Sequence, residues 1–158
     1  MSADPNNPSD TSFQSGGPPK DLEFIRWDKE RMGTGVESVD EEHRQLIGKL
    51  NELYRAHQAG ASVDDISKML RFLGRYAETH FRHEEEIMEH RKCPLWRENR
   101  SAHARFLREY QELASAFSIE DDTDQMATDI ENMVARWLST HICKIDVALR
   151  DSPPPDTK

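Results

Sequence analysis

The sequence has little cysteine: only Cys93 and Cys143 occur among 158 residues, and they lie far apart in the chain. Without a Cys-x-x-Cys pair, the chain has neither a zinc-ribbon pattern nor a dithiol redox motif. Low cysteine content is typical of proteins in a reduced compartment. We therefore expect the protein to be cytoplasmic.

Long apolar runs and dense basic patches are also missing. No stretch approaches the roughly 18 to 20 apolar residues that span a membrane. Acidic residues outnumber basic ones by 30 to 21, giving a net charge of −9, and a nucleic-acid-binding surface requires the opposite balance. The sequence also has no Gly-rich phosphate loop and no Ser-His-Asp order. We expect neither membrane insertion nor nucleic-acid binding.

The two ends of the chain differ from its centre in composition. Residues 1–20 are rich in Pro, Ser, Asn and Gly and lack the cationic start and apolar centre of a signal peptide. We predict a disordered leader there. A flexible C-terminal tail is predicted for residues 151–158, which include three consecutive prolines. Residues 21–150 are then one domain of ordinary size.

Four segments of this domain carry apolar residues at three- and four-residue steps, the pattern of amphipathic helices. Ser38 or Asp40 can cap the first helix and Ser62 the second. The third spans about residues 95–117, and the fourth follows an acidic link and stops before Pro153. Because the links are short and no segment alternates like a strand, we predict an all-α fold. Its architecture is an antiparallel up-down-up-down four-helix bundle with an N-terminal aromatic arm at residues 21–36.

Glu84 is an acidic residue in an otherwise apolar helical stripe. It lies one turn after His80, and the same face carries Leu73 and Ala77. Burying an ionised carboxylate costs several kcal/mol, on the order of the whole stability margin of a small domain, unless a cation meets it. No Lys or Arg occupies an obvious core position, so a metal ion is the working hypothesis.

Other helices supply further candidate ligands. His43, His80, His103 and His141 lie on the inner stripes of four different helices, and Asp146 adds a second carboxylate. At about 1.5 Å of rise per residue, antiparallel helices bring these positions into one layer near one end. Four imidazoles and two carboxylates exceed one tetrahedral zinc site and do not suit calcium or magnesium. Mixed nitrogen and oxygen ligands favour iron or manganese, in a two-metal centre.

The ordered motifs of the chain resemble those of the bacteriohemerythrins, members of the hemerythrin-like family. The resemblance covers about residues 24–149. It is carried by Gly35-Val36, Asp40-x-x-His43, His80-Phe81-x-x-Glu84-Glu85, Pro94, His103-x-x-Phe106-Leu107 and Trp137-Leu138-x-x-His141-Ile142-x-x-x-Asp146. Each motif alone is weak, but their ordered combination is specific.

The resemblance implies a non-haem centre of two iron ions with carboxylate and oxo or hydroxo bridges, which binds dioxygen for transport, storage or sensing. His43 and His80 match the histidines of the iron with an open position. His103 and His141 match two of the three histidines of the other iron. Glu84 and Asp146 match the carboxylates that bridge the two irons. The resemblance identifies no redox partner.

Asn99 departs from the family pattern, which has a third histidine for the second iron one turn before His103. Its amide can coordinate weakly, hydrogen-bond a bound water or leave the position open. His83 is rotated away from His80 and is expected on a helix flank. Weaker retention of the second metal favours two alternatives to an oxygen carrier. One is a redox enzyme acting on peroxide or nitric oxide, and the other is a metal-binding bundle with a modified site.

A second oddity is the spacing of His141 and Asp146. Five residues correspond to about 140° around a regular α-helix, so the two side chains would not share a face. If both reach one centre, the helix must contain a local wide turn or bend.

Overall fold

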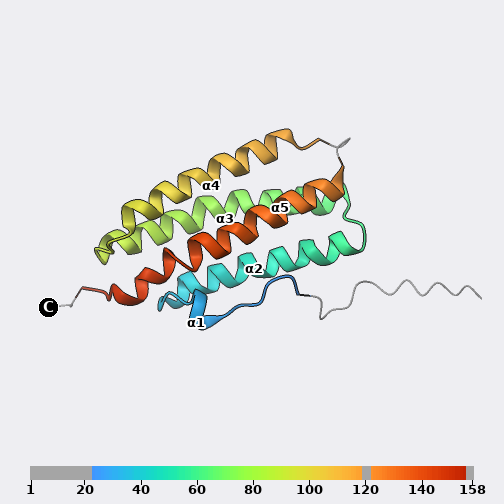
Figure 1. The fold of residues 1–158 in the computed structure, drawn as a ribbon. Helices are drawn as coiled ribbons and strands as arrows, with labels where there is room; N and C mark the ends of the chain where they lie inside the picture. Colours follow the sequence, from blue (N-terminus) through green and yellow to red (C-terminus); the bar gives the residue numbers. More distant parts are fainter. Residues whose placement is uncertain (1–22, 119–121, 156–158) are drawn as a thin grey trace, which may run out of the picture.

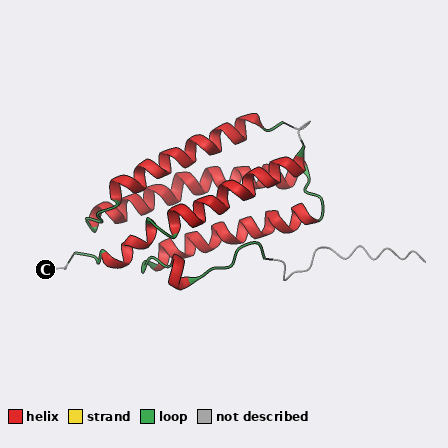
Figure 2. Cartoon of the chain, viewed as in Figure 1, coloured by secondary structure: helices red, strands yellow, loops and turns green. Residues whose placement is uncertain are grey.

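The computed structural model describes residues 23–118 and 122–155, and this part of the chain contains helices and no strands (Figures 1 and 2). The leader expected at residues 1–20 lies outside the described residues, and the residues from 151 onward are described only to 155. None of the described helices is both long enough and apolar enough to cross a membrane.

Four long helices form the bundle. Successive helices run in opposite directions (Figure 1), which confirms the predicted up-down-up-down arrangement. Their bounds are α2 Glu37–Gln58, α3 Val63–His90, α4 Trp96–Ala116 and α5 Thr123–Trp137. The last one continues as a π-helical turn, η1 Leu138–Ile142, and after a short turn as the 3₁₀ helix η2 Asp146–Asp151. Their apolar stripes meet along the bundle axis, where residues such as Leu46, Leu73 and Ile130 are fully buried.

Helix starts follow the predicted caps in α3 but not in α2. The hydroxyl of Ser62 accepts the amide of Asp65, whose carboxylate accepts the amide of Ser62, so a capping box opens α3 as predicted. The prediction that Ser38 or Asp40 caps α2 is wrong, because α2 begins earlier and its N-cap, Val36, makes no side-chain bond. Asp40 instead lies buried inside the helix.

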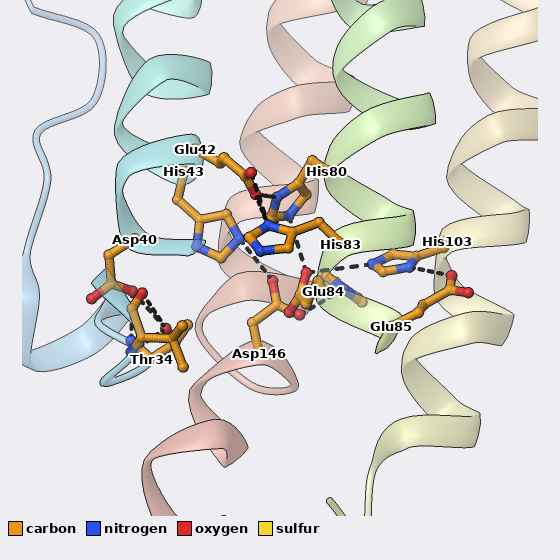
Figure 3. A network of polar contacts seen from close by, with 12 residues as sticks. Thr34, Asp40, Glu42, His43, His80, His83, Glu84, Glu85, His103 and Asp146 are labelled. Atoms are coloured by element: carbon orange, nitrogen blue, oxygen red, sulfur yellow. Dashed lines mark hydrogen bonds and ion pairs between the residues drawn. The ribbon is translucent and has the colours of Figure 1, made fainter. Parts of the chain in front are cut away.

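The Asp40 carboxylate serves the chain that precedes α2. It accepts hydrogen bonds from the amide of Thr34 at 2.7 Å and from the Thr34 hydroxyl at 2.8 Å (Figure 3). Thr34 is fully buried, so this contact satisfies a backbone donor that would otherwise lose its water without a partner. It also fixes the direction in which the chain enters α2.

The N-terminal arm packs on the bundle, as predicted. Phe24 stacks on Tyr54 with ring centroids 4.9 Å apart. The Asn51 amide accepts from the backbone amides of Phe24 and Ile25 and donates to the carbonyl of Ile25. The short helix α1 Lys29–Met32 follows, and the Arg150 guanidinium donates to its carbonyls. The arm and η2 therefore close the same end of the bundle.

Candidate metal centre

Six side chains with metal-binding groups meet inside the bundle, at the end that the arm and η2 close. All of them except His141 are labelled in Figure 3. They come from α2, α3, α4 and the two short helices after α5. Each residue is at most 2% exposed. The set consists of His43, His80, Glu84, His103, His141 and Asp146.

The first group of ligand atoms joins α2 and α3. The Nε2 atoms of His43 and His80 are 3.1 Å apart, and Nε2 of His80 lies 3.0 Å from a Glu84 oxygen. His80 and Glu84 are one helical turn apart, as the sequence predicted. The three side chains have ligand atoms within 4.8 Å of one another, which is close enough to hold one ion.

The second group joins the other half of the bundle and shares Glu84 with the first. Glu84, His103, His141 and Asp146 also have ligand atoms within 4.8 Å of one another. One oxygen of Asp146 lies 2.9 Å from Nε2 of His141, and the other lies 3.3 Å from Nε2 of His43. Both carboxylates therefore lie between a histidine of one group and a histidine of the other.

The π-helical turn η1 explains how His141 and Asp146 reach the same centre. A π turn contains more residues than an α turn, and the chain then breaks its helix before Asp146 opens η2. Both side chains consequently face inward despite their five-residue spacing. The expected wide turn is confirmed.

Several buried ligand atoms make no hydrogen bond in the described part of the chain, although some of them lie close to one another. They include both oxygens of Glu84 and of Asp146 and the Nε2 atoms of His103 and His141. Buried polar atoms almost always have a partner, so such a concentration in one place needs an explanation. A bound cation satisfies all of these atoms at once, and the donor set fits iron.

The pKa shifts of the site follow from its burial and from the close approach of its charged groups. Burial and the charge of Asp146 raise the pKa of Glu84 well above its usual range. Burial acts in the same direction on Asp146, but the neighbouring His141 and His43 hold its pKa well below the usual value. Burial lowers the pKa of His103 to about 2, so this imidazole is neutral and its nitrogen lone pair is free to bind a metal.

Two carboxylates that were not predicted to belong to the site contact the outer nitrogens of two of these rings. Glu42 accepts from Nδ1 of His80, and Glu85 accepts from Nδ1 of His103 at 2.7 Å (Figure 3). Glu85 is only partly exposed, and it contacts His103. The signals for Glu85 in the sequence were its place directly after Glu84 and its presence in the motif His80-Phe81-x-x-Glu84-Glu85.

His83 and Asn99 belong to neither group of ligand atoms. His83 is on the flank of α3, partly exposed, and its Nδ1 contacts Glu42 at 2.9 Å. Asn99 is fully buried one turn before His103, and among the described residues neither polar atom of its amide has a hydrogen-bond partner. Asn99 therefore presents an unsatisfied amide where the family pattern has an imidazole.

The chain was compared with known proteins. The hemerythrin HHE cation-binding domain matches residues 34–149. Relatives include bacteriohemerythrins from Stenotrophomonas maltophilia (strain R551-3), 27% identical over 82% of both chains, and from Pseudomonas aeruginosa (strain LESB58), 26% identical over 77% of this chain and 76% of the relative. No solved structure matches significantly. The family match includes all six residues of the buried cluster, and with this fold and donor set it shows that the chain belongs to the hemerythrin family.

Proposed function

We propose that this protein holds two iron ions and binds dioxygen, for transport, storage or sensing. One observation carries the proposal: two buried groups of ligand atoms, each compact enough for one ion, share Glu84. The relatives named bacteriohemerythrin support iron as the metal. When bound, the iron pair supplies the redox-active, oxygen-binding chemistry that no side chain of this cluster offers.

The protein's part is to position the ligands and to exclude water. His43 and His80 would hold one ion, and His103 and His141 the other. Glu84 and Asp146 would lie between them. Aromatic rings shield the second pair: Phe81 stacks on His103 at 3.9 Å and Trp137 stacks on His141 at 3.7 Å. Such packing keeps the rings in place and lowers the local dielectric constant.

Asn99 favours a second candidate function, a redox enzyme acting on peroxide or nitric oxide. An amide is a weaker metal ligand than an imidazole, so an ion held by His103 and His141 would keep an exchangeable position. A position of this kind suits turnover better than reversible storage.

Metal content and oxygen response test the proposal. Protein purified and then loaded anaerobically with Fe²⁺ should contain two iron ions per chain. Exposure to oxygen should produce a new visible absorption band that removal of oxygen reverses. A band that does not reverse, with peroxide or nitric oxide consumed above the free-iron background, would favour the enzyme. If no iron is retained after reconstitution, the di-iron proposal is wrong and a bundle with a modified site remains.

A further inference from the structure

A cavity opens on the surface between α4 and α5, and His141 of the buried cluster forms part of its wall. Its volume is about 390 Å³. The buried part of its wall is apolar except for one imidazole, and it consists of Ala102, Phe106, Met133, Trp137, His141 and Ile145. Two arginines and two glutamates, all exposed, line its rim. The cavity thus leads from solvent to one of the candidate metal ligands.

The imidazole in the wall belongs to the half of the site that lacks a family ligand. His141 and His103 have ring centroids 5.0 Å apart, and Asn99 lies one turn before His103 on α4. The Asn99 amide has two buried N–H donors and a carbonyl oxygen without partners. An amide of this kind can donate a hydrogen bond to a ligand that takes the position left by the missing imidazole.

The other half of the site is more closely covered. Tyr76 stacks on the His80 ring with centroids 4.7 Å apart, and Glu42 contacts the outer nitrogen of the same ring. The fully buried His43 lies edge-on to His80 at 4.8 Å. His141 is the member of the buried cluster that lines the cavity, and His43, His80, His103 and Asn99 are not part of its lining.

We propose that this cavity admits a small exogenous ligand to the metal held by His103 and His141, and that the Asn99 amide hydrogen-bonds the ligand there. The ligand class is a small anion that coordinates iron, with azide as the probe. The balanced rim, with Arg136 paired to Glu109, does not repel a single negative charge. The inference rests on the proposed function, because it needs an iron ion at this position.

The first test narrows the cavity and measures azide binding to the iron-loaded ferric protein by stopped-flow absorbance. Arg105→Phe and Thr140→Phe place an aromatic ring at the rim from α4 and from the turn after α5, respectively. Arg108→Phe is the matched control, on the exposed side of α4 outside the cavity lining. Both rim variants should slow azide association by about tenfold or more, within the range over which such rates vary among mutants. The control should bind azide at the rate of the unmodified protein.

The second test needs no metal and uses Trp137, which lines the cavity. In a Trp27→Phe/Trp96→Phe background, Trp137 is the remaining tryptophan of the chain. Arg105→Phe should lower the acrylamide quenching constant of its fluorescence, and Arg108→Phe should not. Far-UV circular dichroism verifies that each variant is folded.

Three results would overturn the inference. Equal azide rates in the rim variants and the control, with two iron ions bound, would exclude this route and leave the proposed function intact. Failure of all proteins to retain iron would overturn both, and equal quenching would exclude a route past Trp137.

Discussion

Among single residues, Glu42 and Glu85 show how the outer nitrogen of a histidine controls the inner one. When the Nδ1–H group donates a hydrogen bond to a carboxylate, Nε2 carries no proton, and its free lone pair points into the bundle. Glu42 does this for His80 and Glu85 for His103. Such partners fix both the tautomer and the ring orientation of a metal-binding histidine.

Glu42→Gln should weaken metal binding without removing any ligand. The neutral amide is a poorer acceptor for the His80 N–H, so we expect about 10- to 100-fold lower affinity for the metal, the usual effect of losing such a partner. Competition with a coloured chelator measures it. Glu41→Gln is the matched control, because Glu41 is exposed and adjacent in sequence. Equal affinities in the two variants would show that Glu42 does not position His80.

Asn99→His should restore the missing donor. His103 lies one turn further along α4, so a histidine at 99 points to the same side of the helix. We expect the rate of iron loss to a chelator to fall by about tenfold or more, an effect of the size that other changes to a metal's surroundings produce. We also expect the oxygen-induced absorption band to become more reversible. Asn99→Leu, of similar size and without a donor, is the control. If retention does not change, Asn99 lies outside the coordination sphere.

Helical spacing predicted inward-facing positions for the four histidines and Glu84, because a helix converts spacing into a shared face, whereas Asp146 reaches the same cluster only through the wide turn. Glu42 and Glu85 could not be found in the same way. Each contacts a ring on another helix, and such contacts depend on the rotation and depth of packed helices. The position of Asn99 was predictable, but the lack of partners for its amide was not.

At the scale of elements, η1 decides whether the last helix can serve the centre. The five-residue spacing predicted a distortion, and the structure places a π turn at Leu138–Ile142. The start of α2 was predicted less well, because Asp40 resembles a cap in sequence but bonds Thr34 instead. A local pattern could not reveal that longer-range contact.

Deleting Ser139 should remove the extra residue of the wide turn. Ser139 is exposed and lies in the middle of η1. A regular helix would then rotate either His141 or Asp146 by about 100°, away from the centre. We expect the helical circular dichroism signal to persist while the iron content falls by at least half. Ser139→Ala, which keeps the chain length, should retain its iron, and a deletion variant with full iron content would contradict the role of η1.

His57 links the end of α2 to the start of α5 and gives the stability a pH dependence. Burial alone would lower its pKa, but hydrogen bonds to Glu131 at 2.9 Å and Asp124 at 2.8 Å raise it above 6.5. The protonated form is thus the stabilising one, so its contribution is complete below the pKa of the unfolded chain and is lost as pH rises through the folded value.

Urea unfolding of metal-free protein at pH 6 and pH 8.5 measures this contribution. Asp124 is largely exposed, so its contribution is small. Between pH 6 and pH 8.5, the free energy of unfolding of the unmodified protein should therefore fall by only about 0.5 to 1 kcal/mol more than that of His57→Gln. His90→Gln, at an exposed position, should behave like the unmodified protein. Identical pH profiles for His57→Gln and the unmodified protein would refute the assignment.

For the whole molecule, the core combines a strongly apolar bundle with a layer of imidazoles and carboxylates. The bundle was predictable from helical periodicity and short links. Its metal-free form must keep two carboxylates and four imidazoles away from water, which is costly without a counter-charge. The folding of this protein should therefore depend on metal more than that of a bundle with an apolar core.

Glu84→Gln separates the cost of the buried charge from the gain on metal binding. Since the pKa of Glu84 is raised by burial and by Asp146, its ionised form opposes folding of the metal-free protein at neutral pH. The variant should make the metal-free protein more stable by about 1 to 3 kcal/mol. Metal at 100 times its dissociation constant should raise the free energy of unfolding of the unmodified protein by about 2.7 kcal/mol per site. The variant should lose most of this gain in stability. Denaturant unfolding with and without Fe²⁺ under anaerobic conditions measures both effects, with Glu86→Gln as the exposed control. If Glu84→Gln destabilised the metal-free and metal-loaded proteins equally, Glu84 would be a structural residue of the core and not a shared metal ligand.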